Sequence, residues 1–236
     1  MPKIDAGKYG YAYSAFESSF TTARETGSTV SNQPTAASLL VAQYFRDSGK
    51  GGTNYRMYRF FCAFDTSSYS SGYTISNLTF NFRRTSSTTC TPTICFPTFI
   101  IVKSTAQGSA DTDLSVSDYF SDVVYTTAYS SATNLTSSNA DTSISLNATA
   151  ITDFGTGLLK IVAVQYGNDY SDSGGSSDLT QKLYANFDSG GDGYVPFIEF
   201  DAVASGYAND VIGVSSSDID SVVTVTAGDI SNIIGV

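Results

Sequence analysis

The sequence has no histidine and no tryptophan among its 236 residues, and it has only three cysteines. Without histidine, neither a Ser-His-Asp triad nor a Cys-His pair can form, and the commonest zinc ligand is missing. Cys62, Cys90 and Cys95 are too few for a site of four thiolates and too sparse for a disulfide framework. We expect buried free thiols, with a bridge between Cys90 and Cys95 across a tight loop as the alternative.

Glutamate is also scarce, with only Glu17, Glu25 and Glu199. A glycosidase needs two opposed carboxyl groups, one of them with a raised pKa. Glu199 lies in an apolar strand pattern and is the candidate for such an acid. The favoured interpretation is that Glu199 faces outward and pairs with a basic neighbour such as Arg56 or Arg59. We therefore expect no enzymatic activity.

Basic residues are scarce in the second half of the chain. Residues 1–103 carry ten Lys and Arg against five acidic residues, a balance of +5, whereas residues 104–236 carry two against seventeen, a balance of −15. This asymmetry indicates either an oriented packing surface between copies or two faces of one folded sandwich. The net charge of −10 argues against nucleic-acid binding, which requires a basic patch.

Long apolar runs are absent, since nowhere do eighteen apolar residues follow one another. The first ten residues, MPKIDAGKYG, contain no apolar signal-peptide core, so we expect neither membrane insertion nor export through a signal peptide. The chain is instead rich in Ser and Thr, 64 in total, and in Tyr and Phe, 31 in total. Hydroxyl and aromatic residues with few strong helix formers predict an all-β fold.

Strand patterns recur along the chain, with turn residues between them. The strongest pattern is 55–64, and 73–82 follows it with an expected irregularity near Asn77. The continuous apolar run 158–166 predicts a central buried strand. Nine or ten antiparallel strands without a long helix predict a jelly-roll-like β-sandwich over residues 1–204. Further strands are expected at 9–13, 39–45, 94–102, 143–146, 182–187 and 194–200, with short helical turns near 117–120 and 149–154.

Three segments resemble carbohydrate-binding-like jelly-roll domains. The stretch 59–68, RFFCAFDTSS, resembles a strand of that family that ends in Phe-Asp-Thr/Leu-Ser, and 72–80, GYTISNLTF, resembles the turn and strand that follow. The stretch 194–201, YVPFIEFD, resembles the final strand. The resemblance implies the fold for residues 55–201, whereas an activity does not follow from it.

The last residues repeat a short pattern with a period of eleven, in blocks that open at Val211, Val222 and Ile233. Each complete block predicts a short β-branched strand followed by one capped helical turn. We expect residues 205–236 to form an assembly and anchoring tail, distinct from the sandwich. The apolar residues expected to make its contacts are Val211, Ile212, Val214, Ile219, Val222, Val223, Val225, Ile230, Ile233, Ile234 and Val236.

The tail is too short to fold alone. Ordering its backbone costs roughly 1–2 kcal/mol per residue, and repeats need about three or more stacked units to persist. It should fold only against its own sandwich, against the tails of neighbouring copies, or against another protein of the same particle.

Terminal repeats of this kind resemble those that end virion proteins of tailed phages. The resemblance implies a non-enzymatic component of the virion surface, made in the host cytoplasm, that contacts other virion proteins and copies of itself as a homo-oligomer. We expect a capsid decoration protein. The alternatives are a receptor- or glycan-binding tail-fibre module and a cell-surface carbohydrate-binding module.

Two tyrosines and four aspartates are the candidate ligand contacts. Tyr166 and Tyr170 follow the central strand, and their rings are suited to stack on the sugars of a cell-surface glycan. Two acidic glycine loops offer oxygens to calcium, but neither fits the twelve-residue EF-hand pattern. We expect these loops to be flexible hairpin connections, and we expect no cofactor. The aspartates of the two loops are Asp169, Asp172, Asp188 and Asp192.

Overall fold

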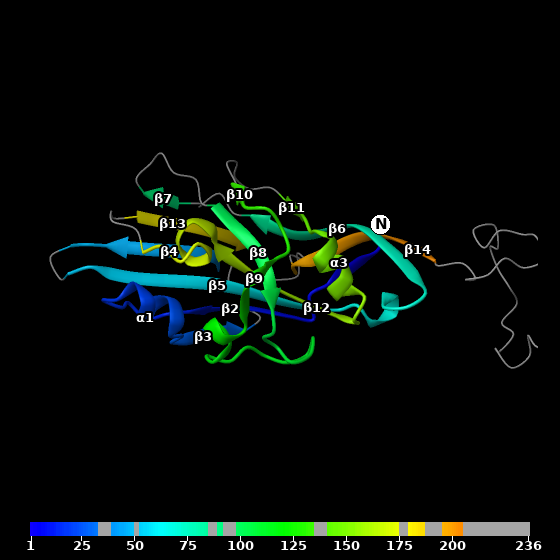
Figure 1. The fold of residues 1–236 in the computed structure, drawn as a ribbon, viewed down its shortest axis with the longest axis horizontal. Helices are drawn as coiled ribbons and strands as arrows, with labels where there is room; N and C mark the ends of the chain where they lie inside the picture. The colour runs from blue at the N-terminus through cyan, green and yellow to red at the C-terminus, as the bar shows by residue number, and fades with distance from the viewer. Residues whose placement is uncertain are drawn as a thin grey trace, which may run out of the picture.

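The computed structural model describes residues 1–32, 39–49, 52–84, 89–91, 98–134, 141–174, 179–186 and 195–204. Within these ranges, fourteen antiparallel strands build a two-layered β-sandwich (Figure 1). The predicted all-β sandwich is therefore confirmed. The structure adds five strands to those predicted from the sequence. Four of them have two to four residues and carry no readable alternation, and the fifth, Val123–Ala128, lies within a segment rich in Ser and Asp.

The first layer is organised around β5 (Asn54–Asp65), the strongest strand pattern of the sequence. One edge of β5 pairs with β2 (Lys8–Tyr13), and the other pairs with β12 (Leu158–Gln165), which pairs in turn with β8 (Thr98–Ser104). The layer is completed by β3 (Thr29–Asn32) beside β2 and by β9 (Val123–Ala128) and β10 (Thr133–Asn134) beside β8.

The second layer is organised around β6 (Tyr73–Arg84). One edge of β6 pairs with β14 (Phe197–Ala204), and the other pairs with β11 (Asp141–Ser145). The first strand of the chain, β1 (Lys3–Asp5), adds to the outer edge of β14. Asn77 has a φ of +51° where the register between β6 and β14 shifts, which confirms the irregularity expected there.

Two strands, β4 (Leu39–Asp47) and β13 (Leu179–Asn186), join the two layers. The strand β4 pairs with the first half of β5, along the edge that β12 occupies further on. The strand β13 pairs with β4, with β7 (Thr89–Thr91) and, through its last two residues, with the end of β6. The hydrogen-bonded ladder is therefore continuous from one layer to the other.

The main core lies between the two layers and follows the alternation of their strands. In β5 the side chains of Phe60, Cys62 and Phe64 point into it, and in β6 those of Phe80 and Phe82 meet them. Each fully buried aromatic or aliphatic side chain contributes about 1.5–3 kcal/mol relative to exposure. The helix α3 (Ala148–Phe154) packs on the same core, with the Asn147 side chain accepting from the first backbone N–H groups of the helix.

A second, smaller core lies on the opposite face of the first layer. There the odd-numbered residues of β5 and the even-numbered residues of β12 are covered by α1 (Phe20–Glu25), α2 (Asp118–Ser121) and η2 (Tyr166–Tyr170), a single helical turn. We call these three elements the cover layer. The central strand predicted at 158–166 is therefore buried on both faces, which explains its continuous apolar run. Another short turn, η1 (Ser67–Tyr69), connects β5 to β6.

Candidate functional site

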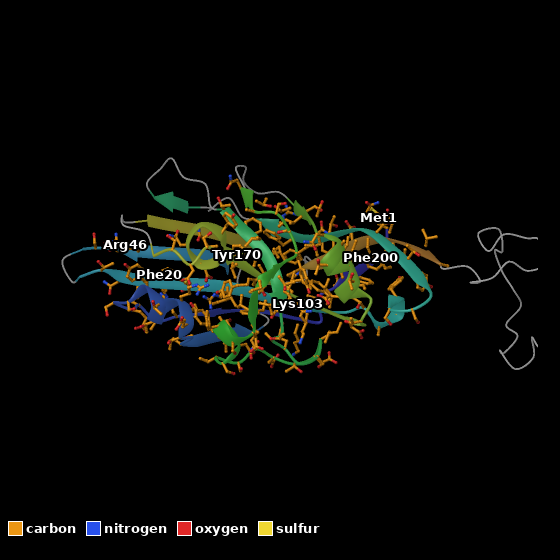
Figure 2. The ribbon with its side chains drawn as sticks, in the orientation of Figure 1. Met1, Phe20, Arg46, Lys103, Tyr170 and Phe200 are labelled. Atoms are coloured by element: carbon orange, nitrogen blue, oxygen red, sulfur yellow. The ribbon has the colours of Figure 1, made fainter. Side chains whose placement is uncertain are left out.

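The residues expected to anchor the chain all belong to 205–236 and lie outside the described residues. The structure shows instead where this segment begins. The last described strand, β14, runs outward and ends at Ala204, and β1 pairs beside it in the opposite direction. Met1 and Phe200 accordingly lie toward the same end of the molecule (Figure 2).

Arg59 of β5 and Asp169 of η2 form a fully buried ion pair beneath the cover layer. Nε of Arg59 lies 2.8 Å from Oδ2 of Asp169, and Nη2 lies 2.7 Å from Oδ1. Both side chains are 0% exposed. Burial alone would lower the pKa of Arg59, but the adjacent carboxylate raises it above its ordinary value, so the guanidinium stays charged.

The same guanidinium ties the cover layer to the sheet. Nη1 of Arg59 donates to the backbone oxygen of Tyr119 in α2 at 2.5 Å, and Nη2 donates to that of Arg24 in α1 at 2.7 Å. The hydroxyl of Tyr125 donates to Oδ1 of Asp169 at 2.8 Å. A buried charge needs several such partners to offset the loss of hydration, and here they come from four elements. The network therefore fixes η2 in position.

Asp169, the first of the calcium candidates, is already paired with other side chains. Its carboxylate is occupied by Arg59 and Tyr125, and Asp172 lies 3.4 Å from Nη1 of Arg24 with its side chain 65% exposed. Asp188 and Asp192 fall outside the described residues. In the part of the chain that the structure describes, no three carboxylates and thiols gather around a common point for a metal ion.

The two candidate glycan residues are brought together by η2. The rings of Tyr166 and Tyr170 stack with centroids 5.6 Å apart and planes 18° from parallel. On its other side Tyr170 approaches Tyr125, at 6.4 Å between ring centroids. Tyr166 is 37% exposed, so it is the ring of this pair that an external sugar can reach. The Gln165 side chain accepts from two backbone N–H groups of η2 and holds the turn.

A hollow of about 270 Å³ lies where β8, β12 and α3 meet. Nζ of Lys103 lies 2.9 Å from Oδ2 of Asp153, and the Tyr129 hydroxyl donates to the same oxygen. Although burial would raise the pKa of Asp153, these two hydrogen bonds lower it below its ordinary value. Lys160 donates to the backbone oxygen of Thr105 at 2.9 Å, and burial lowers its pKa. The polar groups of the hollow thus satisfy one another and hold α3 against β8.

Glu199 lies between fully buried neighbours in β14 and faces outward, across from Lys3 of β1. The partners predicted for it are wrong. Arg59 is committed to Asp169 on the far side of the first layer, and the Arg56 guanidinium lies over the rings of Tyr13, Phe16 and Tyr58, about 5 Å from each centroid. A glycosidase pair built on Glu199 gains no support from this arrangement.

The sequence patterns do not identify the network around Arg59. The available signal is an arginine in the middle of an otherwise apolar strand, because a buried charge requires a partner. Its partner follows 110 residues later, so the pattern alone does not name it. Cys62, by contrast, is a buried free thiol, and burial raises its pKa well above the ordinary value.

No family model matches this chain, and no curated protein matches it. Across the described ranges, none of the helices combines the length and apolar character needed to cross a membrane.

Proposed function

We propose that this chain is a non-enzymatic structural component of a tailed-phage virion, a capsid decoration protein exposed on the particle and attached through residues 205–236. The observation that carries the proposal is the position of the last described strand. Because β1 pairs antiparallel with β14, the first and last described strands lie side by side, and β14 ends at Ala204, directly before the tail in the sequence. The cover layer extends toward the other end (Figure 1).

This geometry suits a displayed domain with a terminal attachment. A β-sandwich with a continuous core is self-supporting, whereas the tail is too short to offset its own ordering entropy. Contacts that order the tail are therefore the contacts that hold the molecule in its assembly. Residues 205–236 contain four aspartates and no Lys or Arg, so a basic surface is the preferred neighbour of the tail.

Deletion of residues 207–236 tests the proposal. We expect the shortened protein to be absent from purified particles while its circular dichroism and thermal unfolding match those of the full chain. Occupancy would be measured by quantitative mass spectrometry of particles made in the presence of equal amounts of either protein. Normal occupancy of a folded, shortened protein would overturn the proposal.

A second candidate function is a receptor- or glycan-binding tail-fibre module, which is favoured by the exposed Tyr166 ring on the fixed η2 turn. The flat apolar face and polar tip of a tyrosine ring suit it to stack on a sugar. A glycan array should then show selective binding that Tyr166→Ala abolishes. Tyr73→Ala is the matched control, because Tyr73 is 42% exposed at the other end of the sandwich. Absence of binding by the full chain would remove this candidate.

A further inference from the structure

The end of the sandwich at which the tail begins is a two-stranded ribbon. Residues Tyr73–Ser76 of β6 pair with Asp201–Ala204 of β14. On the outer edge of β14, however, the ladder with β1 reaches only Glu199, and on the outer edge of β6 the ladder with β11 reaches only Thr79. The ribbon therefore extends past its neighbours on both sides, and the described residues add no third strand to it.

The alternation of β14 determines which of its residues point their backbone N–H and C=O groups to its outer edge. The N–H of Phe200 donates to the oxygen of Pro2 at 3.3 Å, and the oxygen of Pro196 accepts from Ala6 at 2.8 Å, so even-numbered residues face this edge. The register shift inserts its extra residue into β6, which leaves the alternation of β14 intact. The N–H and C=O groups of Ala202 and Ala204 therefore point to the open edge.

Apart from the charge of Asp201, whose carboxylate accepts from the Asn77 side chain, this edge lacks the usual protection of an exposed strand. Natural edges are blunted by lysine, proline or a bulge on the edge strand. Residues 201–204 read Asp-Ala-Val-Ala, and the bulge lies on the other strand. Val203 is 65% exposed on one face of the ribbon, and Tyr73, which is paired with Ala204 and points to the other face, is 42% exposed. An unprotected edge with apolar side chains is suited to accept an added strand.

We propose that the open edge of β14 accepts the tail segment Val222–Val225 of a second copy as an added antiparallel strand. This inference rests on the proposed function of the tail. The segment reads Val-Val-Thr-Val, four β-branched residues without glycine, and it matches the four residues of open edge in length.

The direction of β14 favours a second copy as the source. Because β14 ends at Ala204, a later segment of the same chain has to run in the opposite direction to pair antiparallel with it. In a copy related by a twofold axis and placed end to end, β14 runs the opposite way. The outgoing tail of one copy is then antiparallel to β14 of the other without any reversal. The exchange is reciprocal and closes as a symmetric dimer.

Ala204→Pro in the full chain removes one outward N–H and leaves the ladder with β6 in place, and Ala204→Val is the control that keeps the N–H. Sedimentation over a range of concentrations should show a dimer whose dissociation constant Ala204→Pro raises about tenfold or more and Ala204→Val leaves near that of the parent chain. Equal unfolding temperatures would show that both variants are folded. A parent chain that stays monomeric, or equal association by both variants, would overturn the inference.

Hydrogen exchange at Ala202 and Ala204 separates a second copy from the same chain as the source. Protection that disappears on dilution supports exchange between copies, whereas protection independent of concentration assigns the strand to its own tail and overturns the inference. Particle occupancy distinguishes a failure of the strand addition from a failure of the proposed function. If the chain without residues 207–236 is absent from particles but Ala204→Pro is fully present, the strand addition fails and the proposed function stands.

Discussion

The two ends of this sandwich differ in whether their polar groups are covered and paired or exposed. Toward one end, α1, α2 and η2 cover the first layer. Arg59 and Asp169 pair beneath this cover, and Arg59 also donates to backbone oxygens of α1 and α2. Toward the other end, β6 and β14 extend as a ribbon to which the described residues add no further strand, with Val203 and Tyr73 exposed. Phe20 and Phe200 mark these two ends (Figure 2).

The difference indicates that one end stabilises the fold and the other end is suited to contact another chain. A polar network that is fully buried and fully partnered stabilises the fold and leaves little for a partner to add. An exposed strand edge adds little to the stability of the isolated domain and offers a ready contact to another chain. Changes at the covered end should therefore alter unfolding without altering assembly, and changes at the ribbon should do the reverse.

The largest expected effect is at the covered end. Asp169→Asn leaves the buried Arg59 charge without its counter-ion, and breaking such a pair costs about 3–5 kcal/mol. Urea unfolding of the variant should show this loss. Asp172→Asn is the control, since its side chain is 65% exposed and an exposed pair is worth about 1 kcal/mol or less. Comparable losses in the two variants would contradict a network centred on Asp169.

A smaller effect is expected at high pH from Tyr119. Burial is the main cause that raises the pKa of its hydroxyl from 10.0 to about 12. The folded state thus holds this proton more tightly than the unfolded state, so the contribution of Tyr119 is complete below pH 10.0 and is lost as the pH rises through about 12. Tyr119→Phe should make the free energy of unfolding fall less steeply in this range. An unchanged slope would place Tyr119 outside the network.

The smallest expected effect on stability is at the ribbon. Val203→Lys replaces an exposed side chain that supports no core contact, so the free energy of unfolding should change by less than about 0.5 kcal/mol. A charge on the edge strand should nevertheless oppose strand addition, which sedimentation of the full chain would show as weaker association. A large loss of stability without any change in association would reverse the proposed roles of the two ends.

The sequence predicts the parts of this fold that depend on short-range patterns. Alternation predicts β5 and β6, and the continuous apolar run predicts the doubly buried β12. The cover layer is harder to predict from the sequence. Its helix α1 is a single short helix, FTTARE, whose position depends on tertiary contacts to Arg59. The pairing of Arg59 with Asp169 depends on chain topology, since 110 residues separate the two. The role of the tail stays a prediction, because residues 205–236 lie outside the described residues.

The most direct test of attachment through the ribbon end is hydrogen exchange of the full chain on purified particles compared with the isolated chain. The account predicts added protection at residues 201–204 and in the tail, with unchanged exchange at 119–125 and 166–170 in the covered end. Added protection confined to the covered end, with the ribbon and tail exchanging as in the isolated chain, would contradict it.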